Sequence, residues 1–145
     1  MMEIFKNISF SVVLGMIIHS LASWMDSQFL VTFLENNLIT LLVALMAINT
    51  TTMSVMMTKM SEIKEKHKID FPATVKEMSA SIYEQITLIC VAVMLQIVNG
   101  SPKVKEIWGN ADFVFSSLLA GVFIYAMLIL FDTAKGIFVL LENEK

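Results

Sequence analysis

Four long runs of apolar residues follow one another along the chain, separated by short polar segments. A helix rises 1.5 Å per residue, so about 20 apolar residues are enough to cross the hydrocarbon layer of a bilayer. A helix also closes its own backbone hydrogen bonds, which a lipid environment requires. The pattern predicts one all-α domain over residues 1–145, an integral membrane four-helix bundle with spans at 8–25, 38–58, 79–98 and 113–131.

The polar segments suggest where these helices begin and end. Trp24 and Asp26 indicate an interface at the end of the first span, and residues 35–37 (Glu-Asn-Asn) indicate the start of the second. The apolar stretch 29–34 between them is too short to cross a bilayer. It either lies among the headgroups or extends the second helix.

Two further signals mark the second half of the chain. Thr74 and Glu77 have the spacing of a capping box, which predicts the start of the third helix there. Ser101 followed by Pro102 is typical of a helix start and predicts a short helical turn before the fourth span.

The distribution of lysines predicts the orientation. In a four-span arrangement, two lysines fall on one side, Lys103 and Lys105, and the rest fall on the other. That larger set is Lys6, Lys59, Lys64, Lys66, Lys68, Lys76, Lys135 and Lys145. Because basic residues accumulate on the cytoplasmic side, both termini and a helical hairpin loop at 59–77 are predicted to be cytoplasmic.

Composition agrees with a membrane environment. The chain is 57% hydrophobic and 16% charged, whereas a soluble domain carries about 25% charged residues. Every basic residue is Lys, and Met, Ile, Asn and Phe are abundant, which favours a bacterial source and hence the inner membrane. The net charge of −3 and the lack of a basic aromatic cluster argue against direct nucleic-acid binding.

The single cysteine limits the chemistry. Cys90 cannot form an intrachain disulfide or a paired-cysteine redox site. This disfavours the membrane thiol oxidoreductases. Cys90 is expected to pack as a small apolar residue.

Polar residues at mid-membrane are the first candidates for function. Asn49 and the threonines through Thr52 lie in the middle of the second span. A threonine can bond back to its own helix, but an asparagine cannot do so fully, so Asn49 should face another helix or another subunit. It serves either as glue between helices or as part of a pore lining.

The third span carries one carboxylate, Glu84, about five residues from its predicted cytoplasmic end. An acid inside a membrane is a candidate functional residue. At this shallow position it could instead reach water or Lys76. Gln85 and Gln96 on the same helix are candidates for a hydrogen-bond network between helices.

Metal binding finds little support. His19 in the first span has no companion ligand, so a bonded structural role is favoured over a pH sensor. The methionines of the second span could bind Cu(I) as thioethers, but they are better explained as packing. No cofactor or metal is expected.

Small residues at a spacing of four occur in two spans. Ser11 and Gly15 lie in the first, and Ser117 and Gly121 lie in the fourth. This spacing lets helices approach closely. It predicts tight packing within the chain or between copies, which favours a homo-oligomer.

The central loop is the only sizeable soluble part of the chain. One interpretation is a solvated, positively charged hairpin. The other is a docking surface for a cytosolic protein or for anionic lipid. The candidate docking residues are Glu62, Lys64, Glu65, Lys66 and Lys68.

The length, the number of spans and the Lys-rich segment KMSEIKEKHKID after the second span resemble small four-span membrane proteins of bacterial antiphage and abortive-infection systems. The membrane subunit of the Kiwa system and RexB-like proteins are examples. The resemblance implies an oligomeric membrane sensor or ion-passing effector that works with a soluble partner. It assigns no role to any individual residue.

These observations favour a non-enzymatic, oligomeric membrane module that works with a cytosolic partner in antiphage defence. A small multidrug-type transporter or ion channel is the alternative, and a holin-like lysis protein is the third. An enzyme is disfavoured, because no nucleophile, acid–base pair or metal-ligand spacing is visible.

Overall fold

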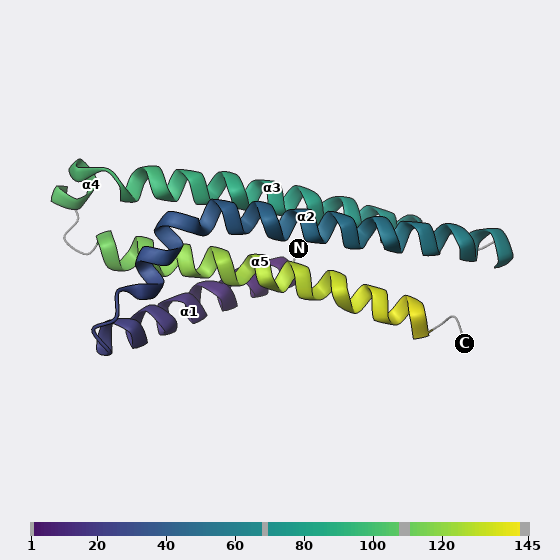
Figure 1. The fold of residues 1–145 in the computed structure, drawn as a ribbon, viewed down its shortest axis with the longest axis horizontal. Coiled ribbons are helices and arrows are strands. Elements are labelled where there is room, and N and C mark those ends of the chain that lie inside the picture. The colour runs from purple at the N-terminus through teal and green to yellow at the C-terminus, as the bar shows by residue number, and fades with distance from the viewer. Residues whose placement is uncertain (1, 68–69, 108–110, 143–145) are drawn as a thin grey trace.

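A computed structural model describes residues 2–67, 70–107 and 111–142 of the chain. Within these ranges the protein contains five helices and no strand (Figure 1). The helices are α1 (Met2–Trp24), α2 (Phe29–His67), α3 (Pro72–Asn99), α4 (Pro102–Ile107) and α5 (Ala111–Glu142). Four of them are long and apolar enough to cross a membrane. The predicted all-α four-helix bundle is confirmed, and it has the architecture of a multi-pass membrane protein.

Helix α2 is longer than the predicted span at both ends. It begins at Phe29, so the apolar stretch 29–34 extends the helix and residues 35–37 lie inside it. The Nδ2 atoms of Asn36 and Asn37 donate to the carbonyl oxygens four residues earlier, at 2.7 and 2.9 Å. These bonds keep two residues that often end helices within a continuous one.

Helix α3 also begins earlier than the predicted span. Its first residue is Pro72, and Phe71 stands at the N-cap position without a side-chain hydrogen bond. The predicted capping box at Thr74 and Glu77 is therefore wrong. Proline at the first position provides the start, because its missing N–H is not needed there. The predicted short turn at Pro102 is α4.

Helix α5 is the centre of the bundle, and α1, α2 and α3 all pack against it. In the most apolar stretch of α5, 56% of the residues are buried, against 11% to 17% in the corresponding stretches of the other three long helices. Helix α5 also has the highest mean hydropathy of the four. A helix that is apolar on all sides is suited to a central position.

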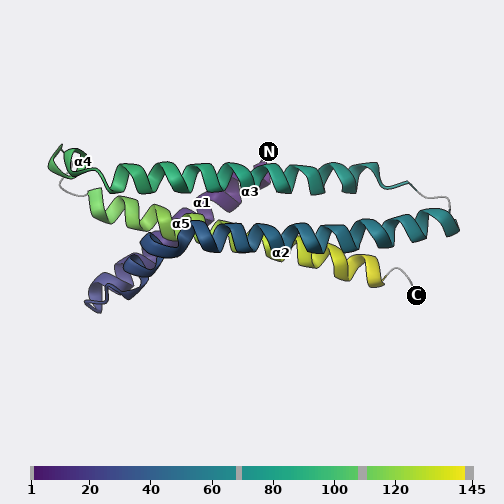
Figure 2. The same cartoon turned by 45° about the horizontal axis from the view of Figure 1, so that its top comes forward.

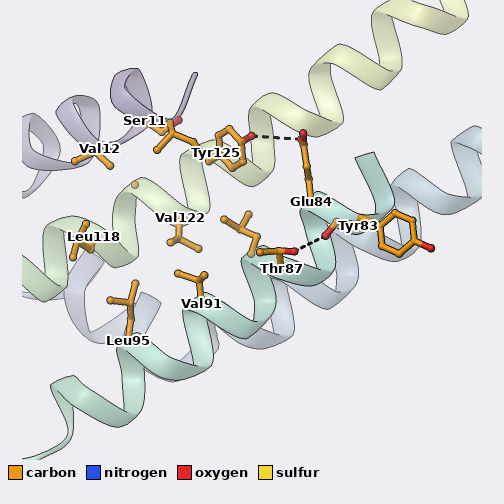
Figure 3. A pocket seen from close by; sticks show the side chains of 13 residues that line it. Ser11, Val12, Tyr83, Glu84, Thr87, Val91, Leu95, Leu118, Val122 and Tyr125 are labelled. Carbon is orange, nitrogen blue, oxygen red and sulfur yellow. Dashed lines mark hydrogen bonds between the residues drawn. The ribbon is translucent and has the colours of Figure 1, made fainter. Parts of the chain in front are cut away.

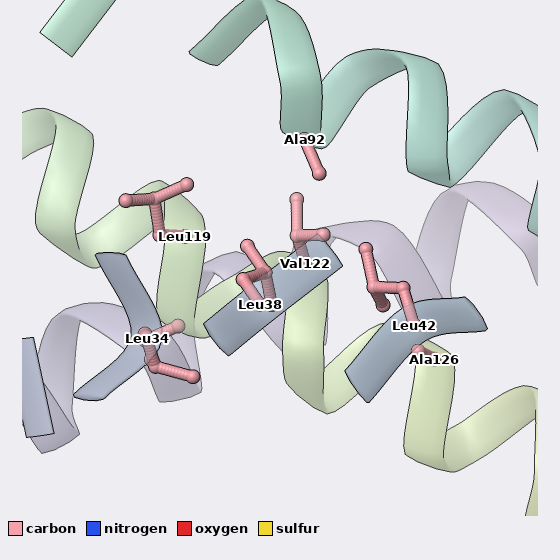
Figure 4. Packing of buried hydrophobic residues seen from close by; sticks show 8 residues of the cluster. Leu34, Leu38, Leu42, Ala92, Leu119, Val122 and Ala126 are labelled. Atoms are coloured by element: carbon pink, nitrogen blue, oxygen red, sulfur yellow. The ribbon is translucent and has the colours of Figure 1, made fainter. Parts of the chain in front are cut away.

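The main core lies where α2, α3 and α5 meet. Figure 4 shows leucines of α2 facing alanines and larger side chains of α3 and α5. The buried set is Leu34, Leu38, Leu42, Ala92, Leu119, Ala120, Val122 and Ala126. Small residues on α3 and α5 leave room for the leucines, so the helices come close together.

The two ends of the bundle differ. Helix α1 lies across one half of α5 and stops part way along it, while α2, α3 and α5 continue beyond (Figures 1 and 2). That extended end, formed by residues 59–67, 72–77 and 132–142, carries many charged side chains and is called here the charged end. Helices α1 and α5 run antiparallel, so both chain termini point toward it.

A second core cluster supports the charged end. It consists of four buried methionines with three partly buried neighbours from α2, α3 and α5. The methionines are Met53, Met56, Met60 and Met78, and the neighbours are Phe71, Ile82 and Ile137. Among the described residues, none of α1 belongs to this methionine cluster.

Candidate functional site

Glu84 lies on α3, which begins seven residues before the predicted span. Because α3 begins at Pro72, the carboxylate is twelve residues from the helix start, or about 18 Å. Lys76, two turns earlier on α3 and within the charged end, forms no ion pair with it among the described residues. The first residues of α3, 72–77, belong to the charged end, so the half-buried Glu84 lies seven residues, or about 10 Å, beyond that end.

Tyr125 on α5 is the hydrogen-bond partner of Glu84. Its hydroxyl donates to Glu84 Oε2 at 3.4 Å, which is long for an O–H···O bond. Tyr125 itself is buried, at 8% exposed. In the described part of the chain this is the only hydrogen bond to the carboxylate, so Glu84 retains acceptor capacity.

A largely apolar groove of about 620 Å³ begins at this pair of residues. It runs between α1 and α3 over the surface of α5, because α1 and α3 both pack on α5 without substantial contact between them. Figure 3 shows Glu84 and Tyr125 near one end of the groove and Leu95 and Leu118 near the other. We call it the membrane groove.

The membrane groove opens to the surroundings of the bundle. Its wall includes Val91, which is 42% exposed, and Ile8, which is 43% exposed. In a bilayer the surroundings of this part of the bundle are lipid. The groove is thus accessible from the side of the protein.

A second cavity meets the membrane groove at the same two residues. It has a volume of about 520 Å³ and reaches from Glu84 and Tyr125 toward the charged end. Glu77 and Asp132 also line it. Glu84 and Tyr125 therefore stand between a groove that faces lipid and a cavity that leads toward water.

The small residues predicted from spacing lie together where α1 crosses α5. Ser11 and Gly15 of α1 are buried against Ser117 and Gly121 of α5. A Cβ atom on Gly15 would stand 2.5 Å from the carbonyl oxygen of Ser117. This α1–α5 contact is one of backbone against backbone, and the two serine hydroxyls in it have no hydrogen-bond partner among the described residues.

Asn49 faces α3 rather than lipid. It is fully buried, and its Nδ2 donates to Ser81 Oγ at 3.3 Å, while its Oδ1 has no partner. Thr50 and Thr51 bond back to carbonyl oxygens of α2, and Thr52 is half-buried. This arrangement favours the role of glue between helices over that of a pore lining.

The two glutamines of α3 have different surroundings. Gln85 is buried, and neither polar atom of its side chain has a hydrogen-bond partner. Gln96 donates to the backbone carbonyl of Glu35 on α2 at 3.1 Å, and Asn99 donates to Glu35 Oε1 at 2.9 Å. The interhelical network thus includes Gln96 but not Gln85.

Sequence reasoning missed Glu35 and Asn99 as members of this network. Both residues were overlooked because the second predicted helix was expected to begin at residues 35–37. An amide at the last position of α3 was a weak available signal, because a helix end needs polar partners.

His19 lines a polar cavity at the end of the bundle opposite the charged end. Its ring meets that of Phe113 edge to face, with centroids 4.9 Å apart. The cavity, of about 470 Å³, also includes Asp26, Glu35 and Asp112. Within the described residues, no group of His, Cys, Asp or Glu is arranged to hold a metal ion.

The candidate docking residues lie on the exposed surface of the charged end, except Lys68, which is outside the described residues. Lys59 pairs with Glu62 at 2.8 Å and Lys64 pairs with Asp70 at 2.6 Å. The hydrogen bond and the charge of Lys59 hold the pKa of the Glu62 carboxyl below its ordinary value. Glu65 and Lys66 are exposed.

A further cavity of about 520 Å³ lies at the turn of this hairpin. Met57, Phe71 and Val75 contribute apolar surface, and Lys64 and Asp70 contribute charge. Met57 and Val75 are 52% and 41% exposed. We call it the hairpin cavity.

Cys90, expected from the sequence to pack as a small apolar residue, is a free thiol on the exposed surface of α3. Comparison of the chain with family models, with curated proteins and with solved structures finds no match.

Proposed function

We propose that this chain is a non-enzymatic membrane module that self-associates and binds a cytosolic protein at its charged end. The observation that carries the proposal is the hairpin cavity, where exposed Met57 and Val75 lie beside the Lys64–Asp70 ion pair. Protein interfaces commonly combine apolar anchors with a charged rim. The cavity fits a partner that inserts an apolar side chain and carries charges of both signs around it.

The ion pairs of the charged end support recognition better than stability. Their side chains are 41% to 70% exposed, and such pairs contribute little to folding. Charges of this kind steer association and give it a salt dependence. The lysine excess also supports a cytoplasmic location for this end.

Charge reversal tests the docking surface. Lys64→Glu, Lys66→Glu and Lys68→Glu together should weaken binding of a partner captured by a photo-crosslinker at Met57. Lys103→Glu on α4 is the matched control and should leave binding unchanged. A correctly inserted triple variant with unchanged affinity would show that docking lies elsewhere.

The orientation is tested separately in a Cys90→Ala background. Labelling of Lys64→Cys by an impermeant thiol reagent should require disrupted cells, whereas Lys103→Cys should react in intact cells. The opposite pattern would overturn the proposed orientation.

Self-association and defence need their own measurements. Chemical crosslinking in native membranes should trap dimers or larger species, and a strictly monomeric chain would contradict the module as proposed. The role in antiphage defence rests on the architectural resemblance alone. Plating of phage on cells with and without the chain and its gene neighbours tests that role.

A transporter is the second candidate, and one observation favours it. Glu84 lies about 10 Å along α3 from the charged end and stands between two cavities, an arrangement suited to a proton-coupled carrier. Glu84→Gln should then abolish proton-coupled flux in liposomes while leaving partner binding intact. Equal flux in the two proteins would remove this candidate.

A further inference from the structure

The membrane groove combines an apolar wall with a single acid. Glu84 is the only charged side chain among the described residues that line it. The remaining wall is mostly aliphatic, with Ser11, Tyr83, Thr87 and Tyr125 as its other polar or aromatic members. A carboxylate placed in such surroundings needs a donor, and the long bond from Tyr125 supplies only one. The groove is therefore incomplete without a further donor beside Glu84.

The charge of the surroundings selects the kind of donor. Neither the membrane groove nor the adjoining cavity is lined by Lys or His among the described residues. Glu77 and Asp132 line the adjoining cavity and add negative charge on the far side of Glu84. An anionic headgroup would be repelled there, and a cationic one would be attracted.

The shape of the groove selects the rest of the ligand. From Glu84 to Leu95 the groove follows α3 for eleven residues, about 16 Å. An extended alkyl chain of roughly twelve carbons has this length. The groove opens to the side, so such a chain can enter from the lipid without passing through water.

We propose that the membrane groove binds an amphiphilic ammonium ligand, whose head lies at Glu84 and Tyr125 and whose alkyl chain lies along α5. The ammonium donates to the free acceptor positions of the Glu84 carboxylate, a charge-assisted bond. The chain occupies the space beside Val91, Leu118 and Val122. The inference concerns binding alone and stands whether or not the chain transports anything.

The head supplies most of the binding free energy. Lipid tails are as apolar as the groove, so moving an alkyl chain from the bilayer into it gains little. A charge-assisted hydrogen bond in these largely apolar surroundings meets less competition from water than it would at the protein surface. The site should therefore distinguish ligands by the head, and the groove should act as a steric filter for the tail.

The first test uses tritiated dodecylamine with the full chain in phosphatidylcholine nanodiscs. Glu84→Gln should bind it at least about tenfold more weakly, because a charge-assisted bond is lost. Glu106→Gln makes the same change on α4, where the side chain lines neither the groove nor the adjoining cavity, and should bind normally. Dodecanol should not compete. Unchanged binding by Glu84→Gln, or equal competition by dodecanol, would overturn the proposal.

A milder variant covers the case in which Glu84→Gln fails to fold. Tyr125→Phe keeps the shape of the groove and removes only the hydroxyl that orients the carboxylate. Dodecylamine binding should fall several-fold with the melting temperature nearly unchanged. Full affinity in a folded Tyr125→Phe protein would show that the head does not lie at this pair of residues.

The second test concerns the tail. Val91→Trp fills the groove from its lipid-facing side and should abolish dodecylamine binding. Met94→Trp is the matched control, because Met94 is 67% exposed on the same helix and does not line the groove. Equal binding by both variants would place the ligand elsewhere.

A helix of a second copy is the competing occupant of the groove. In a Cys90→Ala background, Val91→Cys should form few disulfides between copies, and dodecylamine should suppress them. A disulfide-linked dimer that persists at saturating dodecylamine would overturn the proposal, because the groove would then be a protein interface.

Discussion

The α1–α5 contact and the methionine cluster close two parts of the same bundle in different ways, and each contains a glycine. At Gly15 an added Cβ would meet the Ser117 carbonyl oxygen at 2.5 Å and the Gly121 nitrogen at 2.7 Å. At Gly136 it would meet the Cε and Sδ atoms of the Met56 side chain, at 3.0 and 3.8 Å. One glycine faces rigid backbone, and the other faces the tip of a flexible side chain.

The difference shows what holds each part together. Within the bilayer no hydrophobic effect drives helices together, so α1 depends on close backbone approach to α5. Next to the charged end, α2, α3 and α5 surround methionines that adapt their shape. The first contact depends on geometry and the second on volume, so the two parts should respond differently to the same substitutions.

The largest expected effect is that of Gly15→Ala. The backbone atoms of Ser117 and Gly121 cannot move aside, so α1 must shift, at a cost of about 3 kcal/mol. Gly136→Ala is the control, because the Met56 methyl can rotate away and alanine favours the helix. Unfolding by SDS in mixed micelles measures both. Equal destabilisation by the two variants would remove the distinction between the two regions.

Met56→Ala should have the next largest effect. Met56 is 5% exposed, and its truncation leaves a cavity that costs about 2 kcal/mol, since neighbouring methionines fill part of it. Met56→Leu conserves the volume and should cost less than about 1.5 kcal/mol. The same titration measures the pair. A Leu variant as unstable as the Ala variant would contradict a core that depends on volume.

The smallest expected effect concerns the bond from Asn49 to Ser81, which joins α2 to α3 between the two regions. Asn49→Leu, Ser81→Ala and the double variant form a mutant cycle with a coupling of about 0.6 kcal/mol. Asn49→Leu also removes the buried Oδ1 atom, which has no hydrogen-bond partner among the described residues. The net loss of stability is therefore small. Additive effects would show that the hydrogen bond contributes nothing to the packing of α3 on α2.

A coupling in the cycle would also decide between the two interpretations of Asn49. Glue between helices predicts altered stability with unchanged ion conductance in liposomes. A pore lining predicts the reverse.

Local sequence features were sufficient for the number and type of the helices. A bilayer imposes about 20 apolar residues per span, so span count can be read from hydropathy without any tertiary contact. The spacing of Ser11, Gly15, Ser117 and Gly121 likewise marked faces suited to close packing. It did not say that these two faces meet each other, because small residues are permissive toward many partners.

The helix ends were harder to predict, and the candidate site depends on them. The spacing of Thr74 and Glu77 reflects a local preference for a capping box. In the structure α3 starts earlier, at Pro72, and contributes Met78 to the methionine cluster. That earlier start places Thr74 and Glu77 within the helix, and both line the cavity beside Glu84.

The sequence by itself indicated a membrane environment, the helical class and the polar residues that lie within the apolar runs. Each of these follows from residues close together in the chain. Only the tertiary structure decided which helices touch. It placed Tyr125 of α5 opposite Glu84 of α3 and left α1 and α3 apart, which opened the membrane groove between them. A groove is an absence of contact between distant segments, and no local pattern specifies it, because it depends on how three helices share the surface of a fourth.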